Sequence, residues 1–454
     1  MALVTSIHGF SKVVVVGGGL AGLTTAYRLH TNGIDVELFE ARERVGGRVL
    51  SVLLDGSVVE LGGHSISDGG DAPVFSRLME QFGLKVDHLW VPLTTAFHDG
   101  QQLYTLAEEL EKYKNVCRRD RLEEVAKSAS NMREVLDALF EKGTPLYQEL
   151  EVRLSAYEGG LLEDLSPVYI DTLEAIIEGG IAVAHRVNEA KTIDLFSIKG
   201  GNSKLPLAMS EALDSRVHLG MPLRSVTKAE NGQYVLSFDD GKKVGADIVV
   251  FAIPASQYKK INFEGEVIPR NVLDTFASIQ YGTLGKLQIS TEQSNSIPAT
   301  YVNESGVLLF DPASRKGTMY LAGNSGRFDE KCFATLWTKN KPFFEEMANT
   351  ECELVPSLAG QQIFEKYEGA VGYSWAHDAY AEGSYSYIAS GQEKLFSEVI
   401  DCDGIPMRAA FCPIHDSLYF AGEHTTIYPE IIGTMEAACE SGDRIAKHII
   451  QATP

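Results

Sequence analysis

The first forty residues pass from an apolar run to a helical spacing of apolar residues and then to an alternation of apolar and polar residues. Residues 12–16 form a β-branched run, which predicts a buried strand, and the apolar spacing over residues 20–29 predicts a helix. Gly33 ends that helix, and the alternation over residues 36–40 predicts a second strand. Together these segments predict a βαβ unit of about thirty residues, so the N-terminal part of the chain belongs to the α/β class.

Other parts of the chain follow different patterns. Residues 103–157 place charged and apolar residues at helical spacing, which predicts an inserted helical region. Residues 217–253 alternate apolar and polar positions between turn signals and predict a β-meander, whereas residues 281–387 mix strand and helix patterns and are rich in aromatic residues. Residues 418–450 return to a strand, a glycine turn and a helix. We therefore expect an α/β domain that is interrupted by insertions, which build a second domain.

The composition indicates a folded, acidic protein. Of the 454 residues, 44% are hydrophobic and 9% are aromatic, which is an ordinary share for a globular protein. The 62 Asp and Glu residues exceed the 40 Lys and Arg residues and give a formal net charge of −22. That charge opposes binding to nucleic acids and to anionic membrane surfaces, so we expect neither as a partner. It favours cationic ligands, or it serves solubility alone.

The sequence also bears on the compartment and on metal content. No stretch approaches the ~20 apolar residues that span a bilayer, and the start of the chain lacks the pattern of a signal peptide. The cysteines are scattered, without a paired motif or a partnering histidine cluster: Cys117, Cys332, Cys352, Cys402, Cys412 and Cys439. We therefore expect reduced, buried thiols in a cytoplasmic protein and no metal site.

A GxGxxG motif between the first strand and the first helix consists of Gly17, Gly18, Gly19, Leu20, Ala21 and Gly22. In such a motif Gly17 allows a tight turn, Gly19 lets the backbone approach a pyrophosphate, and Gly22 lets helix and strand pack closely. The N-terminus of the helix favours the phosphate charge. Glu40 lies at the end of the second strand, where a carboxylate accepts hydrogen bonds from ribose hydroxyls. This context predicts that a dinucleotide binds here.

The residues after the motif resemble a known family. The run EARERVGGR at 40–48 and the later ELGG at 60–63 resemble the FAD signature of the flavin amine oxidase superfamily, which includes monoamine and polyamine oxidases. The resemblance implies that FAD contacts Glu40, Ala41, Arg42, Gly46, Gly47, Arg48, Gly62, Gly63 and His64. A side chain such as Arg48 neutralises pyrophosphate, and the paired glycines let backbone amides come close to it. Arg42 and Arg44 are alternatively ordinary surface charges.

The resemblance continues at the far end of the chain, in YFAGEHT at 419–425 and GTMEAA at 433–438. In the family, the Glu of the first motif lies along the ribityl and pyrophosphate region. The helix after the second motif directs its N-terminus at the flavin pyrimidine ring, where reduced flavin carries negative charge. Together with a PLRSV segment whose valine meets adenine, these motifs imply cofactor contacts at Gly422, Glu423, Gly433, Thr434, Met435 and Val226.

The same resemblance implies catalytic and substrate-contacting residues. Lys286 matches a lysine that family members hold near flavin N5 through a water, and an exposed strand lysine is the alternative. The segment that contains Trp375 and Tyr385 resembles a segment of polyamine oxidases and flavin-type histone demethylases. Those enzymes build an aromatic cage in front of the flavin, and Tyr385 matches the position of one wall of that cage. Thr434 takes the place of the second, aromatic wall. His64 matches a histidine near substrate in animal polyamine oxidases, and its alternative is a turn histidine bonded to backbone.

Two departures from family patterns bear on how the flavin is bound and on which class of substrate is oxidised. Ser384 stands where monoamine oxidases carry a cysteine that bonds to flavin, so we expect a non-covalent FAD. Amino-acid oxidases usually place an arginine shortly after the Gly62-Gly63 pair to hold the substrate carboxylate. Here no arginine occurs between Gly63 and Arg77. The sequence therefore favours amines over amino acids.

The resemblance implies an FAD-dependent amine oxidase. Hydride passes from the α-carbon of the amine to flavin N5, the imine hydrolyses to a carbonyl, and O2 reoxidises the flavin to give H2O2. A polyamine or another cationic amine is the expected small-molecule substrate. The alternatives are an L-amino-acid oxidase anchored by a residue such as Arg77, an amine dehydrogenase with another acceptor, and a non-catalytic FAD-bound interaction protein. The oligomeric state is left open.

The expected fold is α/β, with a Rossmann-like FAD-binding domain interleaved with an α+β substrate-binding domain, as in flavin amine oxidases. We assign residues 1–78, 201–262 and 396–454 to the FAD-binding domain. Residues 79–200, which include the helical insertion, and residues 263–395 are assigned to the substrate domain.

Overall fold

A parallel sheet forms the centre of the fold. The structure is a computed structural model that describes residues 12–66, 71–88, 94–99, 103–178, 196–291, 299–303, 306–311, 316–321 and 367–453. The sheet has the strand order β22 (Leu418–Phe420), β13 (Ile248–Phe251), β1 (Val13–Val16), β2 (Val36–Phe39) and β9 (Val217–His218). The strands come from all three segments that the sequence assigns to the FAD-binding domain. The α/β fold class is confirmed, and the domain boundaries stay predictions.

Both faces of this sheet are buried. Neighbouring strands pair in parallel throughout, and parallel sheets are normally covered on both sides. In β1, Val13 and Val15 pack toward the helices, whereas Val14 and Val16 pack toward a second, antiparallel sheet. All four side chains are at most 5% exposed. The unbroken apolar run at the start of the chain is therefore the signature of a strand without a solvent face.

Helices cover one face of the parallel sheet: α1 (Leu20–Thr31), α2 (Pro73–Gln81), α8 (Lys204–Leu213) and α11 (Met435–Ala452). The helix α11 packs closely on α1, because a Cβ at Gly442 would lie 2.3 Å from the carbonyl oxygen of Ala21. Glu436, in the first turn of α11, accepts hydrogen bonds from the backbone N–H groups of Val74 (3.0 Å) and Phe75 (2.8 Å). This carboxylate therefore caps α2 from another helix.

A four-stranded sheet packs against the other face, in the order β12 (Lys243–Ala246), β11 (Tyr234–Phe238), β10 (Leu223–Lys228) and β14 (Asn262–Phe263). The strands β10 to β12 form an antiparallel meander, but the prediction that the meander spans 217–253 is wrong at both ends. The strands β9 and β13 pair in parallel with β2 and β1 instead. Alternation within one strand does not reveal its neighbour, so the local pattern could not show this.

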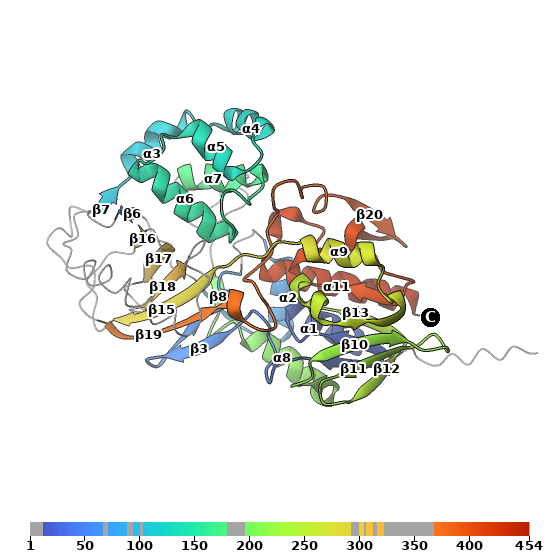
Figure 1. The fold of residues 1–454 in the computed structure, drawn as a ribbon. Helices are drawn as coiled ribbons and strands as arrows, with labels where there is room; N and C mark the ends of the chain where they lie inside the picture. The colour runs from blue at the N-terminus through green and yellow to red at the C-terminus, as the bar shows by residue number, and fades with distance from the viewer. Residues whose placement is uncertain are drawn as a thin grey trace, which may run out of the picture.

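A larger sheet with helices on one side forms the second part of the molecule (Figure 1). Its strands follow the order β19 (Tyr367–Ser374), β15 (Gly285–Thr291), β18 (Lys316–Leu321), β17 (Gly306–Asp311), β16 (Ala299–Asn303), β6 (Thr94–His98) and β7 (Leu103–Thr105). The helices are α3 (Ala107–Lys114), α4 (Arg119–Ser128), α5 (Met132–Leu139), α6 (Pro145–Glu158) and α7 (Ile170–Ile177). They confirm the helical region predicted at 103–157, apart from its first residues, which lie in β7. Much of the segment 281–387 lies outside the described residues.

The remaining elements are small. Apart from short 3₁₀ turns, the further elements of the described residues are the hairpin of β3 (Ser51–Leu54) and β4 (Ser57–Glu60), the pair of β5 (Val86–His88) and β8 (Phe196–Ile198), the hairpin of β20 (Val399–Cys402) and β21 (Ile405–Arg408), and the helix α9 (Arg270–Ser278). Within the part of the chain that the structure describes, no helix is long and apolar enough to cross a membrane.

Candidate active site

A large cavity opens at the carboxyl ends of β1, β2 and β13 and extends to β15 and β18 in the second part. Its volume of about 630 Å³ lies in the usual range for ligand sites, and ligands of open α/β sheets bind at this edge. The predicted site residues that line it are Gly17, Gly19, Leu20, Ala21, Glu40, Ala41, Arg42, Gly46, Gly47, Arg48, Gly62, Gly63, His64, Lys286, Trp375, Tyr385, Gly422, Glu423, Gly433, Thr434 and Met435.

The glycines of the turn between β1 and α1 are needed for different reasons. Gly17 has a φ of 109°, and a Cβ there would lie 2.4 Å from the carbonyl oxygen of Ala252. A Cβ at Gly22 would lie 1.9 Å from the carbonyl oxygen of Gly17, so Gly22 serves packing and does not line the cavity. At Gly19, no described atom lies within 4 Å of an ideal Cβ, and the position faces the cavity. Gly19 thus leaves open the space that a phosphate requires.

Glu40 is held rigidly at the end of β2. Its Oε2 accepts a hydrogen bond from the backbone N–H of Gly18 at 2.6 Å, and its Oε1 accepts one from the backbone N–H of Arg42 at 2.8 Å. The residue is 4% exposed and lines the cavity. A carboxylate fixed in this way can also accept a hydrogen bond from a ribose hydroxyl.

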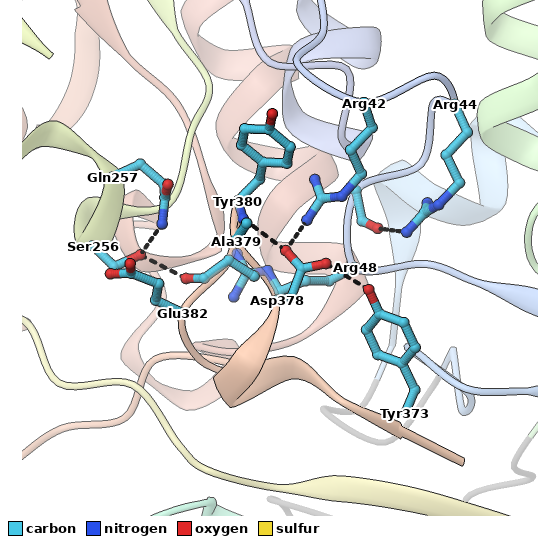
Figure 2. A network of polar contacts seen from close by, with 12 residues as sticks. Arg42, Arg44, Arg48, Ser256, Gln257, Tyr373, Asp378, Ala379, Tyr380 and Glu382 are labelled. Carbon is cyan, nitrogen blue, oxygen red and sulfur yellow. Dashed lines mark hydrogen bonds and ion pairs between the residues drawn. The ribbon is translucent and has the colours of Figure 1, made fainter. Parts of the chain in front are cut away.

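Arg42 belongs to a polar network centred on Asp378, which Figure 2 shows. Arg42 and Asp378 form an ion pair, and the Asp378 carboxylate accepts hydrogen bonds from the Tyr373 hydroxyl (2.6 Å) and the Tyr380 N–H (2.9 Å). Burial opposes ionisation of Asp378, but the Tyr373 hydrogen bond and the Arg42 charge outweigh it and lower the pKa of this carboxyl. The side chains of Arg42 and Asp378 are only 13% and 6% exposed. Arg42 is therefore not an ordinary surface charge.

Arg44 supports the glycine loop. Its guanidinium donates hydrogen bonds to the carbonyl oxygens of Val45 (3.2 Å) and Gly47 (3.0 Å). Gly46 in turn donates from its N–H to the carbonyl oxygen of Gly18 at 2.8 Å, which ties this loop to the βα turn. Arg44 is therefore a partly buried structural residue, and it does not line the described cavity.

Glu423 connects the two ends of the chain. Its carboxylate pairs with Arg48 at 2.9 Å and accepts hydrogen bonds from the N–H groups of Ser386 (3.1 Å) and Gly433 (3.2 Å). Burial opposes ionisation, but the charge of Arg48 leads the effects that lower the pKa of Glu423. Arg48 also donates to the carbonyl oxygen of Ser384 at 2.9 Å. These contacts hold both predicted FAD motifs and the segment around Tyr385 in one unit.

The helix α11 begins at the cavity. Thr434 is its N-cap, and the Thr434 hydroxyl oxygen accepts a hydrogen bond from the Ala437 N–H at 3.1 Å. A Cβ at the neighbouring Gly433 would lie 3.1 Å from the Tyr385 ring, so this glycine makes room for the ring. The Tyr385 hydroxyl donates to the carbonyl oxygen of Tyr157 at 2.7 Å. Thr434 thus serves as a helix cap and carries no ring that could form a second aromatic wall.

Lys286 and His64 lie together beside Tyr320. Lys286 is buried in β15, its Nζ donates to the carbonyl oxygen of Gly62 at 2.5 Å, and its Nζ lies 4.8 Å from the centre of the Tyr320 ring. His64 Nδ1 lies 3.3 Å from the Tyr320 hydroxyl. Burial, with the nearby charge of Lys286, lowers the pKa of His64 to about 3, so His64 is neutral at physiological pH. Trp375 donates from Nε1 to the carbonyl oxygen of Leu61 at 2.9 Å.

Sequence reasoning missed Glu158 as a site residue. Glu158 is the last residue of α6, is 5% exposed, and lines the cavity together with Tyr157 and Tyr169. The Thr172 hydroxyl donates to its carboxylate, and burial raises the pKa of Glu158 to about 8. In the sequence it is one of many charged residues at helical spacing, so no local signal distinguishes it. Tyr320, in β18, lies in a stretch without a motif that resembles the family.

Besides Gly22 and Arg44, two further residues that the sequence singles out do not line the described cavity. Val226 is buried in β10, between β11 and β14, whereas Leu223 and Arg224 of the same strand do line the cavity. Arg77 is exposed on α2 and donates to the carbonyl oxygen of Pro73 at 3.2 Å. Arg77 is therefore not placed to anchor a substrate carboxylate in this cavity.

Comparisons with known proteins show the family to which the chain belongs. Residues 20–450 match the sequence model of flavin containing amine oxidoreductases. The L-amino-acid oxidase of Gloydius blomhoffii is 23% identical over 97% of this chain and 89% of that protein, and the L-amino-acid oxidase of Mus musculus is 25% identical over 96% and 70%. Among solved structures, cyclohexylamine oxidase from Brevibacterium oxydans matches with a TM-score of 0.75 at 16% identity, covering 98% of this chain and 99% of that chain. A double mutant of putrescine oxidase matches with a TM-score of 0.73 at 18% identity, covering 97% and 99%. The chain therefore belongs to the family of flavin-containing amine oxidoreductases and is an oxidoreductase that acts on CH–NH2 donors.

Proposed function

We propose that the protein is an oxidase that binds FAD without a covalent bond, oxidises a small cationic amine, and uses O2 as the electron acceptor. When bound, the flavin supplies a two-electron acceptor for the hydride on the α-carbon of the amine. The products are a carbonyl compound and ammonia or a smaller amine, formed by hydrolysis of the imine, and H2O2. The observation that carries the proposal is that one cavity is lined by the dinucleotide turn at Gly19, by Thr434 at the start of α11, and by Lys286 and Glu158.

Residues along the cavity suit FAD. Gly19 leaves open space for a pyrophosphate, Glu40 offers a carboxylate to a ribose, and Arg48 and the N-terminus of α11 offer positive charge. The hydroxyl of Ser384, a residue that lines the cavity, is buried without a hydrogen-bond partner among the described residues. A polar ligand in the cavity would supply that partner. Because Ser384 carries no thiol, the site supports a cofactor that is bound but not linked.

The substrate end has the chemistry that recognises an ammonium group. The aromatic residues Tyr157, Tyr169 and Tyr385 line the cavity together with Glu158. Aromatic faces and a carboxylate both attract a cation in a site with little water. The neutral ring of His64 adds no charge that would repel the substrate. A diamine could therefore place one nitrogen near Lys286, for oxidation, and the other near Glu158.

The raised pKa of Glu158 makes this pairing dependent on pH. In the protein without substrate, the carboxyl group of Glu158 is mostly protonated below about pH 8, because burial disfavours its ionised form. A bound ammonium favours the ionised form, so binding expels a proton. The affinity for a diamine should therefore increase as the pH rises to about 8, whereas the affinity for a monoamine should lack this component.

Flavin reduction under anaerobic conditions tests the proposal. The test compares 1,4-diaminobutane, butylamine and a panel of L-amino acids in the parent protein and in Glu158→Gln. We expect Glu158→Gln to lower kcat/KM for the diamine about tenfold, which corresponds to ~1.4 kcal/mol, and to leave butylamine unchanged. Glu163→Gln is the matched control, because the Glu163 side chain is 56% exposed and pairs with Arg133. Equal losses for both amines would exclude the ammonium site, and a flavin that no amine bleaches would exclude amine oxidation.

L-Amino acids form the second candidate class. Two observations favour this class. The relatives named above are L-amino-acid oxidases. Lys316 lines the cavity, and its Nζ donates a hydrogen bond to the Ser290 hydroxyl at 2.7 Å. Lys316 would then take the anchoring role that Arg77 cannot fill. Faster bleaching by an amino acid than by its decarboxylated amine, with the preference lost in Lys316→Met, would favour this class over amines.

A further inference from the structure

Two cysteines face each other outside the cavity. The Sγ atoms of Cys402 and Cys412 lie 3.4 Å apart, and both thiols are free. Cys402 ends β20, and Cys412 follows the short helical turn after β21. Both residues are half-buried, so the expectation of buried thiols is wrong for this pair, whereas Cys117 and Cys439 are buried as expected. Cys332 and Cys352 lie outside the described residues.

Cys402 stands next to the tight turn of the hairpin, and a small movement would join its sulfur to that of Cys412. Asp403 and Gly404 have positive φ values of 52° and 81°, which makes the turn between β20 and β21 tight. Cys402 is consequently paired with Ile405, the first residue of β21. Sulfur atoms in a disulfide lie about 2.05 Å apart, so a movement of about 1.4 Å would close the bond. Side-chain rotation can supply a movement of this size.

The same hairpin supports a segment that lines the cavity. Arg408, on β21, donates from Nε to the carbonyl oxygen of Thr426 at 2.6 Å. Arg444, on α11, donates to Met407 Sδ at 3.0 Å and to the carbonyl oxygen of Thr425 at 2.8 Å. Thr425 belongs to the turn that begins with Glu423, whose carboxylate holds Arg48 at the cavity. A bond that fixes the hairpin would therefore stiffen this support.

We propose that Cys402 and Cys412 form a reversible disulfide when the protein meets hydrogen peroxide, and that the bond ties the hairpin β20–β21 to the segment that follows it and so stiffens the contacts of the hairpin with the turn that holds Glu423. The inference rests on the Sγ–Sγ contact and does not depend on the proposed substrate or electron acceptor. In the first step the Cys402 thiolate attacks peroxide, the O–O bond breaks, and a sulfenic acid and hydroxide form. In the second step the Cys412 thiol, with loss of its proton, displaces the hydroxyl group as water and forms the S–S bond. Peroxide is reduced by two electrons, and the two thiols are oxidised to one disulfide.

The surroundings assign the two roles. Burial, together with the neighbouring Cys402, raises the pKa of the Cys412 thiol to about 12, so Cys412 stays protonated. Cys412 also points its Sγ at the carbonyl oxygen of Arg408, 3.7 Å away. The thiolate is the form that reacts with peroxide. Cys402 therefore reacts first, and Cys412 resolves the sulfenic acid.

Peptide mapping of the holoprotein tests the proposal. The protein is exposed to dilute hydrogen peroxide, alkylated, and digested with trypsin, which cuts after Arg408 and so separates the two cysteines. We expect a cross-linked pair of peptides, 395–408 with 409–444, that dithiothreitol abolishes. Fragmentation distinguishes Cys412 from Cys439, which shares its peptide. Full alkylation of Cys402 and Cys412 after peroxide, equal to the untreated sample, would overturn the proposal.

Variants separate the two roles and the effect on the fold. In Cys412→Ser, the sulfenic acid of Cys402 should persist and be trapped by dimedone, whereas Cys402→Ser should show no trapped sulfenic acid at Cys412. Peroxide should raise the Tm of the parent by about 2–5 °C and leave the Tm of both variants unchanged, because the cross-link restrains the unfolded chain. Cys117→Ser, in the helical part of the molecule, is the matched control and should behave as the parent. A parent Tm that peroxide does not raise would overturn the claim that a stabilising cross-link forms between Cys402 and Cys412.

Discussion

Three glycines near the first strand allow one prediction to be worked out in detail, because replacement by alanine should affect stability or cofactor binding differently at each of them. At Gly22 an added Cβ would lie 1.9 Å from a backbone oxygen. At Gly19 no described atom lies within 4 Å of the added Cβ, and the backbone has φ −76° and ψ −179°, which alanine adopts without strain. At Gly33 no described atom lies within 4 Å either, but the φ of 78° is left-handed.

These geometries predict separable effects. Gly22→Ala forces backbone apart and should cost about 3 kcal/mol or more, which lowers the Tm of the apoprotein by about 5 °C or more. Gly33→Ala should cost only the left-handed strain, about 1 kcal/mol, without an effect on flavin. Gly19→Ala should leave the apoprotein Tm within about 1 °C of the parent. Because its Cβ takes the space that a pyrophosphate needs, it should raise the Kd for FAD at least tenfold, or ~1.4 kcal/mol.

Two measurements on each apoprotein check the prediction: the Tm from circular dichroism and the Kd from quenching of flavin fluorescence. If Gly19→Ala binds FAD as tightly as the parent, the turn does not contact the phosphates, and the assignment of the cofactor site is refuted. If Gly22→Ala has the same Tm as the parent, the claim that Gly22 is required for close packing is refuted. Gly33→Ala is the control, because a loss of flavin affinity there would show that stability alone governs the Kd.

Three further changes test other parts of the site. Lys286→Met should keep FAD binding but slow reoxidation of the flavin by O2 at least tenfold in stopped-flow measurements, because the buried ammonium on the Gly62 carbonyl is lost; an unchanged rate would remove Lys286 from the reaction. Ser384→Cys places a thiol at the unpartnered hydroxyl position, so part of the flavin should stay with the protein after acid precipitation, and complete release would contradict the placement. Asp378→Asn should lower the Tm at pH 7, since it leaves Arg42 without its ionic partner in a largely buried pair. Because the pKa of Asp378 is lowered in the folded state, the parent has this stability in full above the pKa of an unfolded aspartate, about 3.9, and loses it as the pH falls through the lowered pKa. The difference between the two Tm values should therefore shrink on acidification, and a constant difference would contradict the pairing.

The parts of the site that the sequence could predict are those with local causes. The βαβ unit follows from apolar periodicity over a few dozen residues, and the conformations at Gly17 and Gly19 follow from the turn between β1 and α1. The N-cap of α11 at Thr434 is likewise a short-range signal. The resemblance to a known family, which rests on such motifs at both ends of the chain, is confirmed by a match over residues 20–450.

The tertiary structure alone decided which distant residues meet. Arg42 and Asp378 form an ion pair although they lie 336 residues apart in the sequence. The residues around each of them give no indication of the partner. Glu158 follows an ordinary helical pattern, and only the packing of α6 at the cavity separates it from solvent. The placement of Arg77 on an exposed helical face is equally invisible in the sequence. Local geometry determines turns and caps, whereas burial, charge pairing and the shape of a cavity depend on contacts that exist only after the chain has folded.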